Sequence, residues 1–148
     1  MVKDNNYNYF MQLALEEAKI SSKNGEVPVG ALSVLNGKVL VKSGNEMENN
    51  KNPLYHAEIL VLLRSAKILY NLGQPIKYKN LDLYVTLEPC PMCAHAISLM
   101  RINNLYYGAD DFKSVGFNLH YEEFADESLR NDPDILAIVN KKKNEETL

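Results

Sequence analysis

The side chains best suited to bind a metal ion and transfer a proton belong to His56, Glu58, Cys90 and Cys93. They occur in the segments His-Ala-Glu and Pro-Cys-Pro-Met-Cys. Zinc in proteins is bound by imidazole nitrogen and thiolate sulfur, and a Cys-x-x-Cys at a helix start presents both sulfurs to one point. One imidazole and two thiolates would supply three ligands. The pattern therefore predicts a zinc site made by both segments.

The number of ligands decides which kind of zinc site is predicted. Structural sites fill all four positions with protein ligands, whereas three ligands leave a position for water, whose pKa zinc lowers to about 7. Cys90 precedes a predicted helix, and the positive end of the helix dipole favours its thiolate. Glu58 is then expected to contact the water rather than the metal, as a general acid and base.

Each residue also has a simpler interpretation. Cys90 and Cys93 follow a predicted strand and open a predicted helix, which is also the arrangement of thioredoxin-like oxidoreductases. His56 alone is typical of a helix start or a core, and Glu58 alone is typical of a partner of the helix dipole. A redox dithiol leaves the upstream His-Ala-Glu unexplained, so the two segments together favour the metal site.

A zinc ion that only braces a noncatalytic RNA-binding domain is the alternative from another class. In that case His95 or His120 would complete the ligands. His95 lies about 200° around the predicted helix from Cys93, which indicates a packing or surface position. Loss of zinc on substitution of His95 would favour the noncatalytic alternative.

The hydrophobic pattern predicts the elements that position these residues. In chain order they are a helix from about Tyr7 to Ser22, strands at Val29 to Leu35 and Val39 to Val41, a solvated loop from Gly44 to Pro53, a helix from about Tyr55 to Tyr70, a strand at Leu81 to Leu87, a helix at Ala94 to Met100 and a strand at Asn104 to Tyr107. Asn36-Gly37 is the residue pair of a type I′ hairpin turn. The stretch 110–133 has a weak pattern.

This order favours a hairpin at the start of the sheet and parallel pairing later, across the helical crossovers. We therefore predict a three-layer α/β domain with a mixed sheet. A length of 148 residues is close to the commonest domain size, and no linker interrupts it. A single domain over residues 1–148 is expected.

Composition excludes several classes of protein. The chain has 16 Lys and Arg against 19 Asp and Glu, a formal net charge of −3, so nucleic acid could be attracted only by a local patch. Its 2 cysteines are too few for a secreted disulfide framework. No stretch approaches the roughly 20 apolar residues that a bilayer requires. A cytoplasmic protein that does not enter a membrane is expected.

With both segments in one chain, the sequence resembles the zinc-dependent cytidine deaminase superfamily. Within it, the chain is most similar to the bacterial tRNA adenosine deaminases, which convert the wobble adenosine of an anticodon to inosine. The segments that carry the resemblance are Glu26 to Ala31, Asn45, Pro53 with His56 to Ile59, and Leu83 to Ala94. The likeness covers roughly residues 7 to 116.

The resemblance implies a three-layer α/β/α fold with a mixed five-stranded sheet, one zinc ion per subunit, a homodimer and tRNA as the partner. The implied site residues are His56, Cys90 and Cys93 for zinc, Glu58 as general acid and base, Asn45 on the target nucleoside, Val27 on the pocket wall, and the backbone around Ala57 on the base. By itself, Asn45 would be a loop residue that stabilises a turn.

The sequence also departs from the family pattern. Leu54 and Tyr55 precede His-Ala-Glu where the family has small residues, and Val115 stands where glycine is common. The acidic pI near 5.6 and an end that is shorter than the family's C-terminal helix keep open a second substrate class, free cytosine, guanine or cytidine. Candidate phosphate contacts for tRNA are Lys77, Lys79, Lys113 and the triplet Lys141 to Lys143.

Overall fold

The computed structural model of the protein describes residues 4–73 and 80–109. Its elements are α1 (Asp4–Lys23), β1 (Gly30–Leu35), β2 (Lys38–Gly44), α2 (Ala57–Asn71), β3 (Leu81–Leu87), α3 (Pro91–Leu99) and β4 (Asn104–Ala109). The predicted order of helices and strands is confirmed. The stretch 110–133, His120 and the candidate lysines at 77, 79, 113 and 141–143 lie outside the described residues.

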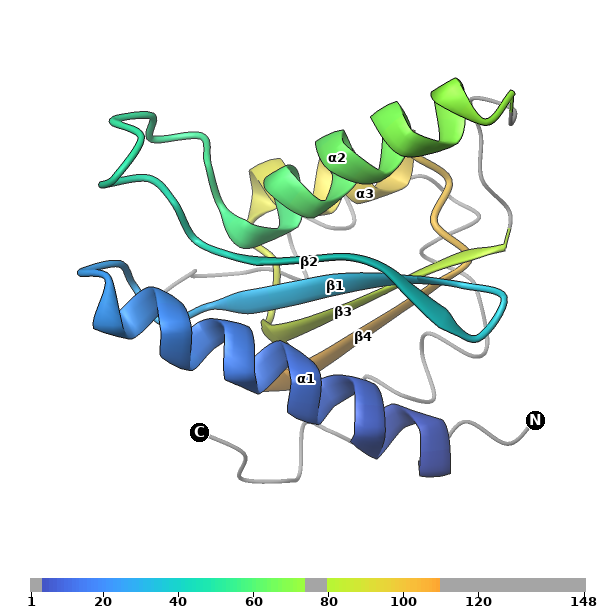
Figure 1. Ribbon diagram of the computed structural model, residues 1–148, viewed down its shortest axis with the longest axis horizontal. Helices are drawn as coiled ribbons and strands as arrows, with labels where there is room; N and C mark the ends of the chain where they lie inside the picture. Colours follow the sequence, from blue (N-terminus) through green and yellow to red (C-terminus); the bar gives the residue numbers. More distant parts are fainter. Residues whose placement is uncertain (1–3, 74–79, 110–148) are drawn as a thin grey trace.

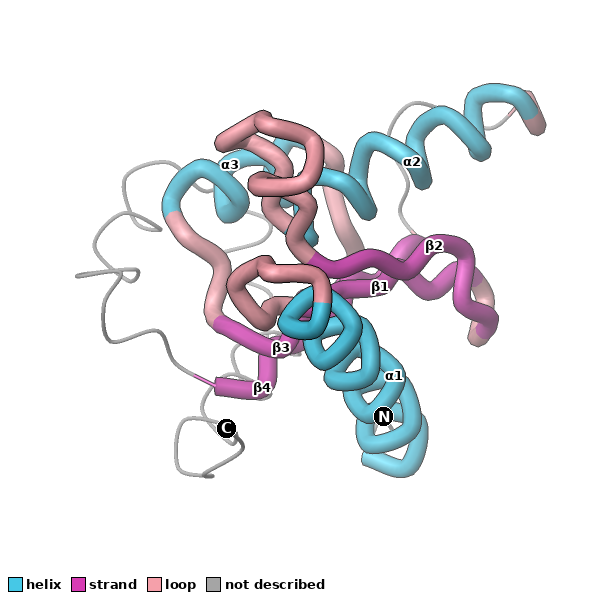
Figure 2. Tube along the Cα trace, turned by 60° about the vertical axis from the view of Figure 1, so that its left-hand side comes forward, coloured by secondary structure: helices cyan, strands magenta, loops and turns pink. Residues whose placement is uncertain are grey.

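The strands form one mixed sheet in the order β2-β1-β3-β4. β1 pairs antiparallel with β2 and with β3, whereas β3 and β4 pair in parallel across the α3 crossover. Helix α1 covers one face of the sheet, and α2 and α3 cover the other (Figures 1 and 2). The three-layer α/β fold is therefore confirmed. The sheet of the described residues has four strands, whereas the resemblance implies five.

The β1–β2 hairpin turns at Asn36-Gly37 as predicted. Both residues have positive φ, 51° and 83°, as a type I′ turn requires. This turn lies at the end of β1 that is opposite to Gly30. β2 then runs back beside β1, and the loop that begins at Asn45 follows it.

Two glycines let α1 pack directly on the start of the hairpin. A Cβ atom on Gly30 would lie 2.0 Å from the carbonyl oxygen of Ala14, and one on Gly44 would lie 1.7 Å from the Ser21 hydroxyl. No side chain fits at either point. The close contact fixes the segments that directly flank these glycines, including Val29 and Asn45, against the C-terminal half of α1.

Both faces of the sheet are buried in apolar contacts. On the α1 face, Tyr84 and Tyr106 stack with ring centroids 4.5 Å apart, and Tyr7 and Phe10 of α1 pack on them. The opposite face is covered by the second cluster, which lies under α2 and α3 and includes Val61. The sheet is thus a rigid base for the loops at its edge.

Helices α2 and α3 do not begin at the residues that the sequence pattern predicts. Helix α2 begins at Ala57, and His56 is its N-cap residue with φ −68° and ψ 152°, so the prediction of a start near Tyr55 is wrong. Helix α3 begins at Pro91 rather than Ala94, with Cys90 as N-cap. Proline is tolerated at the first helical position because the N–H it lacks has no partner there.

None of the described helices is both long enough and apolar enough to cross a bilayer.

Candidate metal centre and active site

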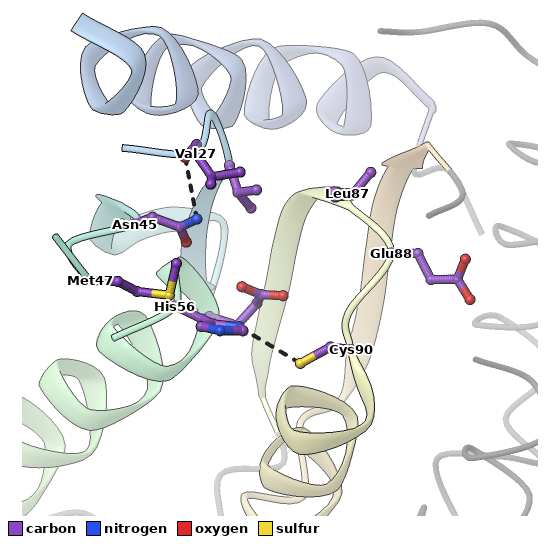
Figure 3. A pocket seen from close by; sticks show the side chains of 9 residues that line it. Val27, Asn45, Met47, His56, Leu87, Glu88 and Cys90 are labelled. Carbon is purple, nitrogen blue, oxygen red and sulfur yellow. Dashed lines mark hydrogen bonds between the residues drawn. The ribbon is translucent and has the colours of Figure 1, made fainter. Parts of the chain in front are cut away.

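The imidazole and the two thiols meet between the N-terminal ends of α2 and α3. His56 and Cys90 are the N-cap residues of these helices, and Cys93 lies in the first turn of α3. The Nδ1 atom of His56 lies 3.7 Å from Sγ of Cys90 and 3.5 Å from Sγ of Cys93. All three ligand atoms lie within 4.8 Å of one another. Figure 3 shows the contact between His56 and Cys90.

These distances fit a tetrahedral zinc site. With Zn–N near 2.0 Å and Zn–S near 2.3 Å, the nitrogen and sulfur ligands of one ion lie about 3.6 Å apart. The observed separations of 3.5 and 3.7 Å match that edge. In the ranges 4–73 and 80–109, this is the one group of three metal-ligating side chains close enough to share an ion, and it leaves out the exposed His95.

The charge state of the two cysteines also suits a cation. A hydrogen bond from the Cys93 thiol, helped by His56, outweighs burial and lowers the pKa of Cys90 to about 4. The hydrogen bond to Cys90, burial and the charges of Glu58 and Cys90 raise the pKa of Cys93. A second thiolate is thus costly without a positive ion, and a bound divalent cation would remove that cost.

Glu58 is a buried carboxylic acid beside this group. It is 4% exposed in the first turn of α2, and it lines the same pocket as His56 and Cys90. Burial raises its pKa to about 7, with a further contribution from the charge of Cys90. A carboxyl group with such a pKa can both accept and release a proton near neutral pH, which is what a general acid and base needs.

The pocket beside the metal group is lined by both apolar and polar residues. Its lining residues are Val27, Val29, Asn45, Met47, His56, Glu58, Leu87, Glu88 and Cys90. The structure therefore brings Val27, Asn45 and Glu58, which lie in separate segments of the sequence, to one place. Cys93 and Ala57 are not among the lining residues, and both are fully buried.

Val29, Met47, Leu87 and Glu88 also line the pocket but are not among the residues that the sequence predicts for the site. Leu87 is the last residue of β3 and Glu88 follows it, two residues before Cys90, and this adjacency was a usable signal. Figure 3 shows the side chain of Glu88 pointing away from His56. Met47 had no signal, because its place depends on how the loop 45–56 folds.

Asn45 joins three segments of the site. Its Oδ1 accepts a hydrogen bond of 2.7 Å from the backbone N–H of Ala57, and its Nδ2 donates one of 3.2 Å to the carbonyl oxygen of Val27. Asn45 is 5% exposed. The backbone N–H of Ala57 is thus engaged by Asn45 and is not presented to the pocket.

Leu54 and Tyr55 precede His56 but do not line the pocket. Leu54 is 56% exposed, and Tyr55 is half-buried. Their bulk is therefore accommodated outside the cavity, on the surface of the loop.

The chain is similar to a known family of deaminases and to individual members of it. Residues 4–109 match the family model of the cytidine and deoxycytidylate deaminase zinc-binding region. The tRNA-specific adenosine deaminase of Agrobacterium fabrum (strain C58) is 40% identical over 140 residues, covering 95% of this chain and 90% of that protein.

Solved structures of deaminases have the same fold as this chain. One, from a study of A-to-I editing by tRNA:A34 deaminases at the wobble position of transfer RNA, superposes with a TM-score of 0.65 at 48% identity, over 72% of this chain and 78% of the other. Guanine deaminase from Bacillus subtilis shares the fold, with a TM-score of 0.66 at 24% identity over 95% of this chain and 97% of the other. The chain therefore belongs to the cytidine and deoxycytidylate deaminase family, within the group of tRNA-specific adenosine deaminases.

Proposed function

We propose that this protein is a zinc-dependent hydrolase that converts the wobble adenosine of tRNA anticodons to inosine. The observation that carries the proposal is the meeting of His56, Cys90 and Cys93 beside a pocket that also holds the buried Glu58. The likeness to a tRNA-specific adenosine deaminase, which is 40% identical over 95% of this chain, also supports the proposal.

His56, Cys90 and Cys93 hold zinc, one ion per subunit. Zinc supplies a lowered pKa for a water molecule at its remaining position. The three side chains come from two helix starts, where the dipole of α3 favours the thiolate of Cys90. This division keeps the ion between two rigid elements rather than on a loop.

Glu58 moves the protons of the reaction. Water adds its oxygen to C6 of adenine and loses a proton, which Glu58 accepts. Glu58 then delivers it to the ring nitrogen beside C6. It next takes the proton of the hydroxyl formed on C6 and passes it to the amine, so that the bond from C6 to the amine breaks, ammonia leaves and C6 becomes a carbonyl. Burial suits Glu58 to this exchange because it makes the protonated and ionised forms similar in free energy at neutral pH.

Asn45 and Val27 bind the target nucleoside. The amide of Asn45 keeps one N–H and one lone pair beyond its bonds to Val27 and Ala57, so it can contact a base while it is held in place. Val27 is 54% exposed and offers an apolar surface at the pocket wall. The backbone around Ala57 contributes because its N–H donates a hydrogen bond to Oδ1 of Asn45 and so fixes the position of that side chain.

The protein acts as a homodimer of single-domain subunits over residues 1–148 in the cytoplasm, where its tRNA substrate is found. The outer surfaces of α2 and α3 expose Leu63, Tyr70 and Leu99, and both helices lie on the same side of the sheet (Figure 1). Apolar side chains grouped in this way are typical of an interface between protein chains. Sedimentation equilibrium tests the dimer, and a monomer at micromolar concentration would contradict it.

One experiment separates this function from deamination of free bases. The zinc-loaded protein is incubated with an anticodon stem-loop carrying adenosine at the wobble position, and separately with guanine, cytosine, cytidine and adenosine. We expect inosine at the wobble position and no ammonia from the small molecules. Ammonia from a free base, with an unchanged stem-loop, would establish the free-base alternative.

A further inference from the structure

Glu26 directly precedes the pocket residue Val27. Its carboxylate is hydrogen-bonded to other residues of the chain. Glu26 is 6% exposed. Its oxygens accept hydrogen bonds from the backbone N–H of Glu48 at 3.0 Å, and from the backbone and side-chain N–H groups of Asn49 at 2.8 and 2.7 Å. Bonds of this kind to an ionised acceptor are stronger than neutral ones.

The bonded N–H groups begin a single turn of helix. The N–H of Asn50 donates to the carbonyl oxygen of Glu46 at 3.1 Å, and that of Asn52 donates to Met47 at 3.0 Å. The first N–H groups of a helical turn have no partner within it, and Glu26 supplies one from another segment. Burial raises the pKa of Glu26, but the N–H groups of Asn49, Glu48 and Met47 outweigh burial and lower it.

The start of the turn is attached on its other side to α2. Arg64 donates to both carboxylate oxygens of Glu46, at 3.0 and 3.2 Å, and also to the Ser43 hydroxyl at 3.2 Å. The N–H of Glu46 donates to the carbonyl oxygen of Tyr55 at 3.0 Å, which closes the loop. The turn is therefore held from two directions.

The two ends of this loop are functional residues. Asn45 stands directly before it and His56 directly after it, and Met47 inside it lines the pocket. Figure 3 shows Val27, Asn45 and Met47 on the same side of the cavity, facing Leu87 and Cys90. A displacement of the turn would move Met47 first and would strain Asn45.

We propose that Glu26 is a positioning residue of the active site: its carboxylate fixes the 46–52 turn so that Met47 and Asn45 form the wall against which the substrate base binds. The proposal rests on the function proposed above for its substrate. Zinc binding does not depend on Glu26, because His56 is also held by the start of α2. Loss of the carboxylate should therefore weaken substrate binding more than the chemical step.

Glu26→Gln is the direct test, because it keeps the size of the side chain but places an N–H₂ group against N–H donors. Glu48→Gln is the matched control. It removes an equal charge, in this case from the turn itself, but the Glu48 side chain is exposed and only its backbone N–H contacts Glu26. Zinc content, KM, kcat and hydrogen exchange at Met47, Glu48 and Asn49 are measured for each variant.

We expect E26Q to retain zinc, to raise KM by about tenfold and to change kcat by no more than about threefold, because misplaced binding groups cost binding first. The three amides should exchange about tenfold faster. E48Q should match the wild type in all four quantities. Equal KM values for E26Q and E48Q would overturn the proposal, and so would faster exchange without a change in KM.

Asn49→Ala provides a second route if E26Q does not fold. Asn49 is exposed, and its side chain donates to Glu26 and to the carbonyl oxygen of Asn24 at 3.0 Å. We expect about a threefold rise in KM with zinc retained, and an unchanged KM would count against the proposal. Kinetics are measured on whichever substrate the wild type deaminates. Failure of the tRNA function then appears as an inactive wild type with the stem-loop, whereas failure of the Glu26 proposal appears in the comparison of variants.

Discussion

The 2.7 Å hydrogen bond from the backbone N–H of Ala57 to Oδ1 of Asn45 joins the end of β2 to the first residue of α2. Both residues are buried. Asn45 therefore has a structural task besides any contact with substrate, and its substitution should affect folding as well as activity.

Asn45→Ala leaves the buried N–H of Ala57 without its acceptor. We expect the free energy of unfolding to fall by about 1–3 kcal/mol, the cost of an unsatisfied buried donor. Urea titration of the zinc-loaded protein measures it. Asn52→Ala is the control, because Asn52 accepts a bond from Leu54 in an exposed part of the same loop and should cost about 0.5 kcal/mol. Equal losses in both variants would contradict the assignment.

Glu58→Gln removes the proton carrier and keeps the shape of the site. We expect stoichiometric zinc with kcat lowered by about 10²- to 10⁴-fold, the range for loss of a general acid and base. Glu88→Gln changes the other buried carboxylate that lines the pocket, and a loss under about tenfold is expected because its side chain points away from His56 (Figure 3). Wild-type turnover in E58Q would exclude the proton-transfer role.

Cys93→Ser and His95→Ala separate the predicted ligands from the nearby histidine. We expect C93S to lower zinc affinity by at least about 100-fold. H95A should keep zinc, because His95 is exposed and lies outside the ligand group. Competition with a chromogenic chelator measures both affinities. Release of zinc from H95A would support the noncatalytic, four-ligand alternative.

The stability supplied by Glu26 should depend on pH. Its pKa in the folded protein is below the ordinary value of 4.5, so the folded state binds this proton more weakly than the unfolded state. The contribution is fully present above pH 4.5 and is lost as pH falls through the lowered folded-state pKa. We expect the difference in unfolding free energy between wild type and E26Q to shrink in acid. A difference that stays constant with pH would contradict this.

Regular elements were predictable where local pattern and local chemistry coincide. The strand Leu81–Leu87 has the bounds that its composition predicts, because it is flanked by polar residues and by Pro89. The Asn36-Gly37 turn was predictable for the same reason, since both residues accept positive φ. The grouping of His56, Cys90 and Cys93 was predictable because the two segments have the residue types and spacing of a zinc site.

The loop from Asn45 to His56 was not predictable in detail. Its shape is set by partners far away in sequence, Glu26 on one side and Arg64 on the other. Local composition identifies such a stretch only as polar and solvated. The helical pattern before α2 also extended past the true start, because Tyr55 continues the apolar spacing although His56 has an extended backbone.

The turn of the β1–β2 hairpin lies at the end of these strands that is far from the pocket. β1 starts at Gly30, next to the pocket residue Val29, and ends just before the exposed turn Asn36-Gly37, so the whole strand separates the turn from the active site. A fluorophore or a tether attached at the exposed Asn36 is accessible to solvent and lies outside the pocket. The turn is thus a natural handle for immobilising or labelling the working enzyme.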